Sequence, residues 1–174
     1  MTTGTGIPVV SVVGKSDSGK TTLMERLIGA LAERGYRVAS VKHHVHDFDI
    51  DVPGKDSWRH AKAGAAVSLV SSPSKLGMTR TMDHEATLEE LQSLAGDVDI
   101  MLTEGYRRAG NVRIEVSRHA RSTELVCEPR ELFALVTDNT ELEVGDLPVF
   151  DLDDAGGLAD LVEATFLKGV PHGD

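Results

Sequence analysis

The chain has 174 residues, of which 40% are hydrophobic and 26% charged, and its formal net charge is −10. This length suits one well-packed domain, since domains cluster near about 100 to 150 residues, and we expect a single domain over residues 1–174. The acidic balance argues against a general nucleic-acid-binding protein, because neutralising phosphates requires a basic surface. Any anionic ligand must therefore be held by a local site.

Membrane and secretion signals are missing from the sequence. No apolar run approaches the roughly 18 to 20 residues that cross a bilayer, and residues 1–6 lack the basic region and apolar stretch of a signal peptide. Cys127 has no second cysteine with which to form an intrachain disulfide, which agrees with a reducing compartment. We expect a cytoplasmic protein with no membrane partner.

The first part of the chain predicts a strand, a glycine-rich turn and a helix, in that order. Residues 7–13 are a continuous apolar run rich in valine, typical of a strand buried in a parallel sheet. In residues 20–34 the apolar side chains recur at helical spacing, and Gly35 follows as a helix stop. Residues 37–42 predict a second strand, which leads into a polar stretch over residues 43–55.

The rest of the chain continues to alternate strands with helices. The expected elements are helices at 57–63 (with Asp56 as its N-cap), 87–94 and 157–166, and strands at 66–70, 76–82, 98–103, 112–116, 132–136 and 148–151. Such alternation predicts an α/β fold in which a mostly parallel twisted β-sheet is flanked by helices on both faces.

A phosphate-binding pattern lies between the first strand and the first helix. Gly14-Lys15-Ser16-Asp17-Ser18-Gly19-Lys20-Thr21 matches GxxxxGK[ST], the P-loop pattern. Its glycines let backbone N–H groups turn inward at the positive end of the following helix. Lys20 is a candidate catalytic residue that adds charge for the β- and γ-phosphates, and the Thr21 hydroxyl is a candidate Mg²⁺ ligand. Since the flanking strand and helix are the context the pattern requires, we predict a P-loop NTPase.

A magnesium-dependent P-loop protein also needs a carboxylate near the metal, usually at the end of a neighbouring strand. Glu104 follows directly after the apolar run that ends at residue 103, at the strand end where α/β sheets bind ligands. Asp99 opens the same run and would lie at the opposite end. We therefore favour Glu104 as the metal-side, catalytic carboxylate, with Asp47, Asp49 or Asp51 of the polar stretch as alternatives.

The polar stretch is rich in histidine and aspartate: its sequence is His43-His44-Val45-His46-Asp47-Phe48-Asp49-Ile50-Asp51. These side chains could bind a structural metal or form a Mg²⁺ or substrate loop. The alternation of aspartates with apolar residues also fits an exposed β-ribbon with one wet face. A local basic cluster could hold a second anionic group or form a solvated helix face; it comprises Lys42, Lys55, Arg59, His60 and Lys62.

Three further motifs, in order, accompany the P-loop. The first is Val41-Lys42-His43-His44. The middle motif is Phe48-Asp49-Ile50-Asp51-x-Pro53-Gly54-Lys55-Asp56-Ser57, followed by Arg59-His60 and Ala63-Gly64-Ala65. The last is Thr103-Glu104-Gly105-Tyr106-Arg107. The set resembles the molybdopterin-guanine dinucleotide biosynthesis protein B (MobB) family. The resemblance runs from Val9 to about Arg108 and more weakly over residues 132–138, and the middle motif is far more specific than the P-loop.

The resemblance implies a GTP-binding, weakly GTP-hydrolysing, Mg²⁺-dependent homodimer that assists attachment of GMP to molybdopterin, as an adapter for the nucleotidyltransferase MobA. It implies that residues 14–22, from Gly14 to Thr22, hold the phosphates and that Glu104 lies on the magnesium side. The polar stretch and the residues after it would face the nucleotide or the pterin. The candidate contacts there are Lys42, His43, His44, Asp49, Lys55 and Arg107. Arg107 stands where a lysine is expected, so it does not suit a role that needs a small ammonium.

The resemblance indicates the base-recognition residue least directly, because the sequence has no Asn-Lys-x-Asp motif. Asp138, just after the strand expected at 132–136, is the candidate for pairing with guanine. An aspartate that accepts two N–H bonds from guanine discriminates against adenine, which has no matching donor pair. Asp138 and Asn139 also fit an ordinary turn.

Two other functions stay open on the same residues. A small P-loop kinase or ligase would transfer a phosphoryl group from ATP, with the histidine-rich stretch holding the acceptor and an arginine over the γ-phosphate. The candidate arginines are Arg107, Arg108, Arg113 and Arg118. A nucleotide-gated binding module would instead bind GTP with negligible turnover.

Overall fold

The computed structural model describes residues 6–44, 46, 48–106 and 112–169. The chain divides into two compact units, one of residues 1–43 and 91–174 and the other of residues 44–90. The single domain expected over the whole chain stays a prediction. Within the described residues, no helix combines the length and the apolar character needed to cross a membrane.

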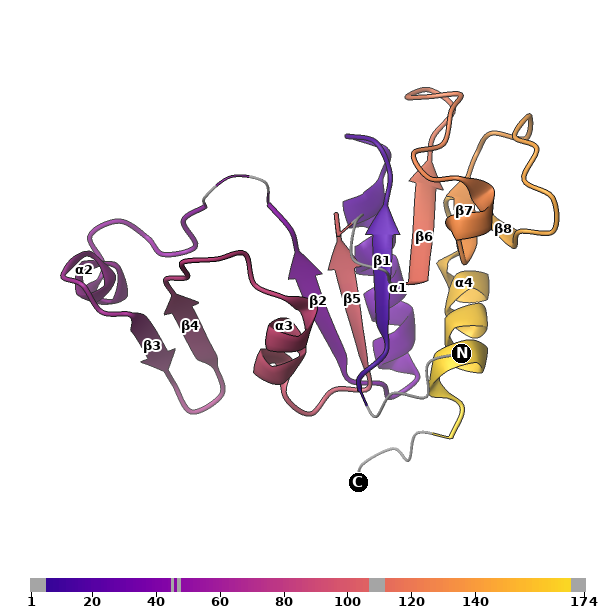
Figure 1. The fold of residues 1–174 in the computed structure, drawn as a ribbon. Helices are drawn as coiled ribbons and strands as arrows, with labels where there is room; N and C mark the ends of the chain where they lie inside the picture. Colours follow the sequence, from indigo (N-terminus) through magenta and orange to yellow (C-terminus); the bar gives the residue numbers. More distant parts are fainter. Residues whose placement is uncertain (1–5, 45, 47, 107–111, 170–174) are drawn as a thin grey trace. The chain divides into compact units, whose positions relative to one another are not determined.

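The larger unit is built on a six-stranded sheet (Figure 1). Its strands, in spatial order, are β2 (Val38–Lys42), β5 (Ile100–Glu104), β1 (Val9–Val13), β6 (Val112–Ser117), β7 (Ala134–Thr137) and β8 (Val149–Phe150). Each neighbouring pair described in this sheet is parallel, so the carboxyl ends of all these strands lie at one edge. The predicted parallel sheet is confirmed.

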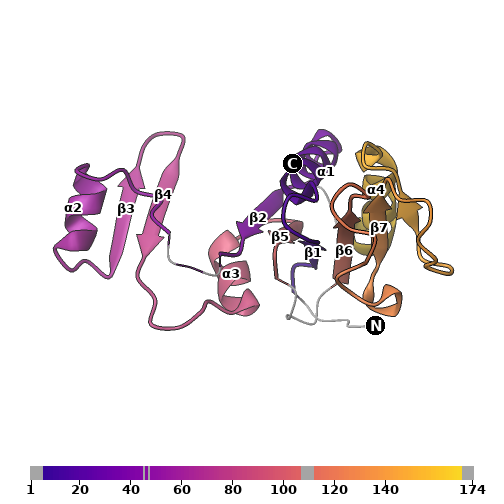
Figure 2. The ribbon, with the colours of Figure 1, turned by 90° about the horizontal axis from the view of Figure 1, so that it is seen from above.

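Helices cover both faces of this sheet (Figure 2). On one face lie α1 (Lys20–Glu33) and α4 (Ala155–Val162), which continues as a π-helical turn, η2 (Glu163–Leu167). On the other face lie residues 91–95 of α3 (Leu88–Ala95), where Gln92 Nε2 donates to the carbonyl of Ile7 at 2.6 Å. A short 3₁₀ turn, η1 (Pro129–Glu131), precedes β7.

The core of the larger unit forms where α1 and α4 pack on the sheet. Leu23, Leu27 and Leu31 make one buried stripe along α1, at the helical spacing expected from the sequence. Fully burying such a side chain contributes about 1.5 to 3 kcal/mol to the free energy of unfolding. At the far end of α1, Arg34 Nη1 donates to Glu163 Oε2 at 2.6 Å, and this hydrogen bond lowers the pKa of Glu163. The buried stripe therefore anchors α1 to the sheet, and the Arg34–Glu163 contact joins the end of α1 to η2.

The smaller unit contains α2 (Asp56–Lys62) and a hairpin of β3 (Val67–Ser71) and β4 (Leu76–Arg80). Both strands were expected, but the sequence pattern did not indicate that, among the described residues, they pair with each other alone and run antiparallel. The reason is the connection, residues 72–75, which is far too short for the crossover that a parallel pair needs. Asp56 as N-cap was wrong: Lys55 is the N-cap, and Asp56 lies in the first turn, where its charge favours the helix dipole.

Candidate functional site

The loop from Gly14 to Thr21, called here the glycine-rich loop, leaves β1 and enters α1. Three of its residues have positive φ: Gly14 at 146°, Gly19 at 101° and Asp17 at 56°. Glycine adopts these angles without strain, and aspartate is one of the few other residues that tolerates the left-handed region. Gly19 is the N-cap of α1, so the loop delivers its backbone to the positive end of that helix.

Gly14 is also required because its position leaves no room for a side chain. A Cβ on Gly14 would lie 2.4 Å from the carbonyl oxygen of Val116 and 2.8 Å from Ser18 Oγ. The first contact is with the backbone of the adjacent strand β6, which cannot move aside as a side chain can. The glycine therefore lets the loop pack directly against β6.

Replacing Gly14 by alanine should lower the free energy of unfolding by roughly 2 to 5 kcal/mol, because overpacking and a strained φ each cost energy. Gly29 is the matched control: it lies in α1 with nothing within 4 Å of an added Cβ, so Gly29→Ala should raise stability by about 1 kcal/mol. Urea unfolding of both variants measures the difference. Equal stability of the two would contradict the packing described here.

The Lys20 side chain folds back over the glycine-rich loop. Its ammonium donates to the carbonyl of Lys15 at 2.6 Å and to that of Gly14 at 3.2 Å. The charge is therefore held over the loop rather than in solvent. A cation in this position is suited to phosphate oxygens.

Thr21 and Glu104, the two predicted metal ligands, lie side by side. Thr21 Oγ1 donates to both oxygens of Glu104, at 3.1 and 3.2 Å, and Lys42 Nζ lies 3.6 Å from Glu104 Oε1. The Glu104 side chain is only 12% exposed. Asp99 lies at the other end of β5, where it accepts the backbone N–H of Arg37 at 2.6 Å. The structure thus places Glu104, and not Asp99, beside the glycine-rich loop.

The spacing of these two oxygens suits a small divalent cation. Neighbouring ligands of an octahedral ion, each about 2.1 Å from the metal, are about 3 Å apart. Magnesium sites use one or two protein oxygens and keep several waters or phosphate oxygens. Thr21 and Glu104 therefore fit Mg²⁺ by both their chemistry and their separation.

His43 extends the site beyond Lys42. Its backbone N–H donates to the carbonyl of Glu104 at 2.9 Å, and its ring centroid lies 4.6 Å from that of Tyr106. Gly105, with φ of 99°, turns the chain between Glu104 and Tyr106. Of the predicted substrate contacts, Lys42 and His43 thus lie beside Glu104.

The other predicted substrate contacts belong to the smaller unit or lie outside the described residues. His44, Asp49 and Lys55 belong to the smaller unit, and Arg107 and the alternative carboxylate Asp47 lie outside the described residues. In the parts of the chain that the structure describes, no cluster of three or more His, Cys, Asp or Glu side chains could hold a metal. Residues 46 and 48–50 form no strand, so the β-ribbon expected as one alternative is not seen there.

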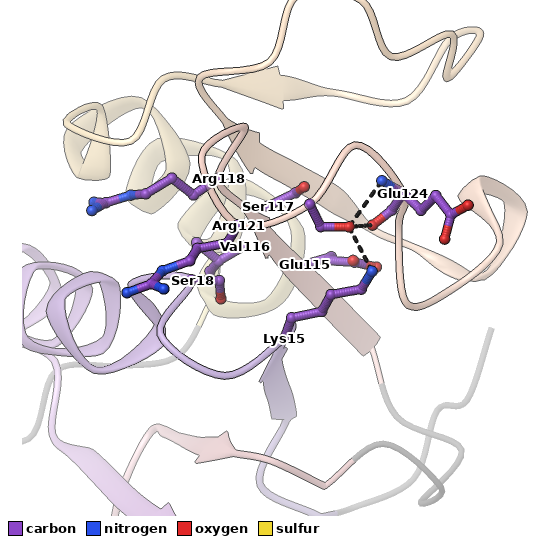
Figure 3. A pocket seen from close by; sticks show the side chains of 9 residues that line it. Lys15, Ser18, Glu115, Val116, Ser117, Arg118, Arg121 and Glu124 are labelled. Carbon is purple, nitrogen blue, oxygen red and sulfur yellow. Dashed lines mark hydrogen bonds between the residues drawn. The ribbon is translucent and has the colours of Figure 1, made fainter.

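The segment after β6, residues 118–127, is tied to the glycine-rich loop (Figure 3). Lys15 Nζ donates to Ser122 Oγ at 2.5 Å. Both oxygens of Glu115, a buried residue of β6, accept backbone N–H groups: Val126 at 2.6 Å and Cys127 at 2.9 Å. Glu115 was missed by sequence reasoning, since a carboxylate inside a strand indicates a solvent-facing position. A glutamate between two buried apolar residues of a central strand is the signal that was available.

Asp138 lies at the carboxyl end of β7, two strands from β1, which is about 10 Å at ordinary strand spacing. It is exposed, and its Oδ1 accepts the backbone N–H of His119 at 2.6 Å. Asn139 follows in a turn, with its N–H donating to Thr137 Oγ1 at 3.0 Å. The geometry keeps both expectations for Asp138 open: base recognition and turn formation.

Comparison with known proteins identifies this architecture. Residues 9–138 match the family model "Molybdopterin guanine dinucleotide synthesis protein B". The molybdopterin-guanine dinucleotide biosynthesis adapter protein of Escherichia coli K12 is 39% identical over 167 residues, covering 91% of this chain and 93% of that protein. The protein of the same name from Haemophilus influenzae is 31% identical, with coverage of 90% and 88%.

Solved structures of this family have the same fold as this chain. Bacillus subtilis MobB superposes with a TM-score of 0.71 at 31% identity, covering 91% of this chain and 97% of that one. A crystal structure of molybdopterin-guanine biosynthesis protein B gives a TM-score of 0.68 at 32% identity, with coverage of 90% and 97%. The chain has the P-loop NTPase type of fold predicted from its sequence, and it belongs to the molybdopterin guanine dinucleotide synthesis protein B family.

Proposed function

We propose that this chain is a GTP-binding adapter protein in the biosynthesis of molybdopterin guanine dinucleotide. The observation that carries the nucleotide part is the contact of Thr21 with Glu104 beside the glycine-rich loop, 3.1 and 3.2 Å from hydroxyl to carboxylate. A phosphate-binding loop, a cation and a divalent-metal ligand pair at one sheet edge are the parts that a nucleoside triphosphate with Mg²⁺ requires. The names of the relatives support the pathway.

In this proposal the backbone of residues 14–22 and the Lys20 ammonium bind the phosphates, while Thr21 and Glu104 hold Mg²⁺. The magnesium ion, when bound, neutralises charge on the phosphate oxygens. Glu104 accepts from Thr21 and faces Lys42, and in this proposal its role is to hold the metal rather than to take a proton from the attacking water. We expect GTP hydrolysis to be slow, in keeping with an adapter, and we expect the protein to act in the cytoplasm.

The test of the adapter role is a reconstituted reaction. Purified nucleotidyltransferase MobA, molybdopterin and Mg²⁺-GTP are incubated with and without this chain, and the yield of molybdopterin guanine dinucleotide is measured. We expect a higher yield with the chain present, and retention of MobA on the immobilised chain. An unchanged yield together with no retention would contradict the adapter role.

Guanine recognition is assigned to Asp138 within this proposal. Its carboxylate can accept the two N–H groups of guanine and finds no such pair on adenine. Replacing Asp138 by alanine should reduce the preference for GTP over ATP by about tenfold to a hundredfold, since hydrogen bonds to a charged group contribute about 1.5 to 3 kcal/mol. Affinities for both nucleotides, measured by calorimetry, give the ratio. An unchanged ratio of the two affinities would mean that a residue other than Asp138 recognises guanine.

A homodimer is part of the proposal, and the β3–β4 hairpin is its candidate interface. One face of the hairpin carries exposed apolar side chains, with Val67 and Leu69 from β3 and Leu76 and Met78 from β4. The register places Leu69 directly opposite Met78. A two-stranded sheet is marginal alone and is stabilised when a further layer covers its apolar face. The same face of a second copy supplies such a layer with two-fold symmetry.

Placing a charge on this face should break the dimer. In Leu69→Glu the carboxylate would lose its hydration at the interface, which costs several kcal/mol. Leu94→Glu is the matched control, because Leu94 is also half exposed but lies in α3. Light scattering after size exclusion should give a dimer for the wild type and the control, and a monomer for Leu69→Glu. A dimeric Leu69→Glu protein would remove the hairpin from the interface.

A further inference from the structure

Arg118 lies against the glycine-rich loop from the β6 side. Its Nη2 is 3.6 Å from the position that a Cβ on Gly19 would take, and Val116 Cγ1 is 4.0 Å from the same point. Arg118 follows β6 directly, at the sheet edge from which the glycine-rich loop also departs. Figure 3 shows the side chains of Arg118 and Arg121 extending in the same direction, whereas Lys15 extends the opposite way.

The guanidinium of Arg118 has no carboxylate partner among the described residues, although the chain is strongly acidic. Within that part of the chain Arg121 also lacks one, whereas several other arginines of the larger unit do have one. Arg113, on the same strand, lies 3.5 Å from Glu131, and Arg34 lies 2.6 Å from Glu163. Arg118 is thus a cation left available at the glycine-rich loop.

Arg118 lines a small, closed pocket together with hydrogen-bond donors and with the carboxylates of Glu115 and Glu124. Ser18 and Ser117 line the same pocket, their side chains are buried, and neither hydroxyl has a hydrogen-bond partner among the described residues. A buried hydroxyl without a partner costs about 1 to 3 kcal/mol. This pocket has no room for a ligand, so the part of Arg118 that is available to an anion is its exposed end beside Gly19.

The backbone of the segment that begins with Arg118 is held in place before any ligand arrives. This segment is fixed at three points: Ser122 by Lys15, Val126 and Cys127 by Glu115, and His119 by Asp138. Glu115 lies in β6, and Asp138 directly follows β7. Because the backbone is already fixed, only the exposed side chain of Arg118 has to be ordered when a ligand binds.

We propose that Arg118 is a phosphate-binding residue that completes the nucleotide site from the β6 side, where its guanidinium contacts the α- and β-phosphates. This inference rests on the proposed nucleotide function. Gly19, the nearest part of the loop, belongs to the backbone cradle for those two phosphates, whereas Lys20 reaches toward the γ-phosphate. Arg118 therefore serves GDP and GTP alike, which distinguishes it from an arginine that acts on the γ-phosphate alone.

The experiment compares wild type, Arg118→Met and Arg118→Lys with the control Arg130→Met, by calorimetry with Mg²⁺ and GTP, GDP or pyrophosphate. Arg130 is exposed and pairs with Glu128 on η1, away from the loop. We expect Arg118→Met to weaken all three ligands by about tenfold to a hundredfold. Arg118→Lys should recover part of the loss, because an ammonium keeps the charge but not the two-pronged contact. Unfolding temperatures confirm that each variant is folded.

The outcomes separate this inference from the proposed function. If wild type binds GTP and GDP and Arg118→Met binds them equally well, the inference fails and the nucleotide site stands. If only GTP binding is lost, Arg118 contacts the γ-phosphate and the assignment to the α- and β-phosphates is overturned. If wild type binds none of the ligands, the proposed nucleotide function fails, and this inference with it.

Discussion

Replacing Lys20 by alanine should weaken GTP binding by roughly a hundredfold or more. The ammonium lies over the glycine-rich loop, 2.6 and 3.2 Å from two loop carbonyls, and in the proposed function it is the charge that meets the terminal phosphates. Each hydrogen bond between charged groups contributes about 1.5 to 3 kcal/mol to binding. Losing contacts to two phosphates therefore costs about 3 to 6 kcal/mol, which is a hundredfold or more in affinity. Calorimetric titration with Mg²⁺-GTP measures the change.

Lys168→Ala is the control for this experiment. Lys168 is an exposed lysine of the same unit, at the end of η2, and its loss changes the net charge by the same amount. The control should bind GTP as wild type does, and both variants should unfold at similar temperatures. Wild-type affinity in Lys20→Ala would mean that the glycine-rich loop does not hold the phosphates.

The second large effect is expected in Glu104→Gln, which should lower GTP turnover by about a hundredfold while changing GTP affinity only a few-fold. Glutamine keeps the shape and can still accept from Thr21, but it loses the negative charge that faces Lys42 and would hold Mg²⁺. Stabilisation of developing charge is what a metal supplies in phosphoryl transfer, and removing one such group typically costs about 10² to 10³ in rate. Single-turnover hydrolysis measures the rate without interference from product release.

Asp99→Asn provides a matched carboxylate-to-amide change on the same strand. Asp99 lies at the opposite end of β5, where it binds the backbone of Arg37. Its variant should keep wild-type turnover even if stability falls slightly. Equal turnover in Glu104→Gln and wild type would remove Glu104 from the metal site.

The strand, loop and helix around Gly14 could be predicted because the information is local. A valine-rich run, a glycine pattern and apolar residues at helical spacing each fix their own element, and right-handed parallel topology then brings the ends of β1 and β5 together. The contact of Thr21 with Glu104 follows from that topology. Neighbouring parallel strands present their carboxyl ends at one edge, whatever the intervening sequence.

Contacts between segments distant in sequence could not be predicted in the same way. Glu115 is buried because the chain returns to it with the N–H groups of Val126 and Cys127, and no local pattern encodes that return. Arg118 was one of four candidate arginines in the sequence, and what separates it from Arg113 is its distance to Gly19 and its lack of a carboxylate partner among the described residues. The hairpin of β3 and β4 likewise depends on the choice of partner strand, which strand propensity does not determine.

The measurement that tests the account most directly is calorimetric titration of the wild-type chain with GTP and with ATP in the presence of Mg²⁺. The account predicts clear GTP binding, weaker ATP binding, and loss of GTP affinity when Mg²⁺ is removed by a chelator. Equal or tighter binding of ATP would contradict it and would favour a small kinase or ligase on the same fold. Absence of binding to either nucleotide would contradict the nucleotide site itself.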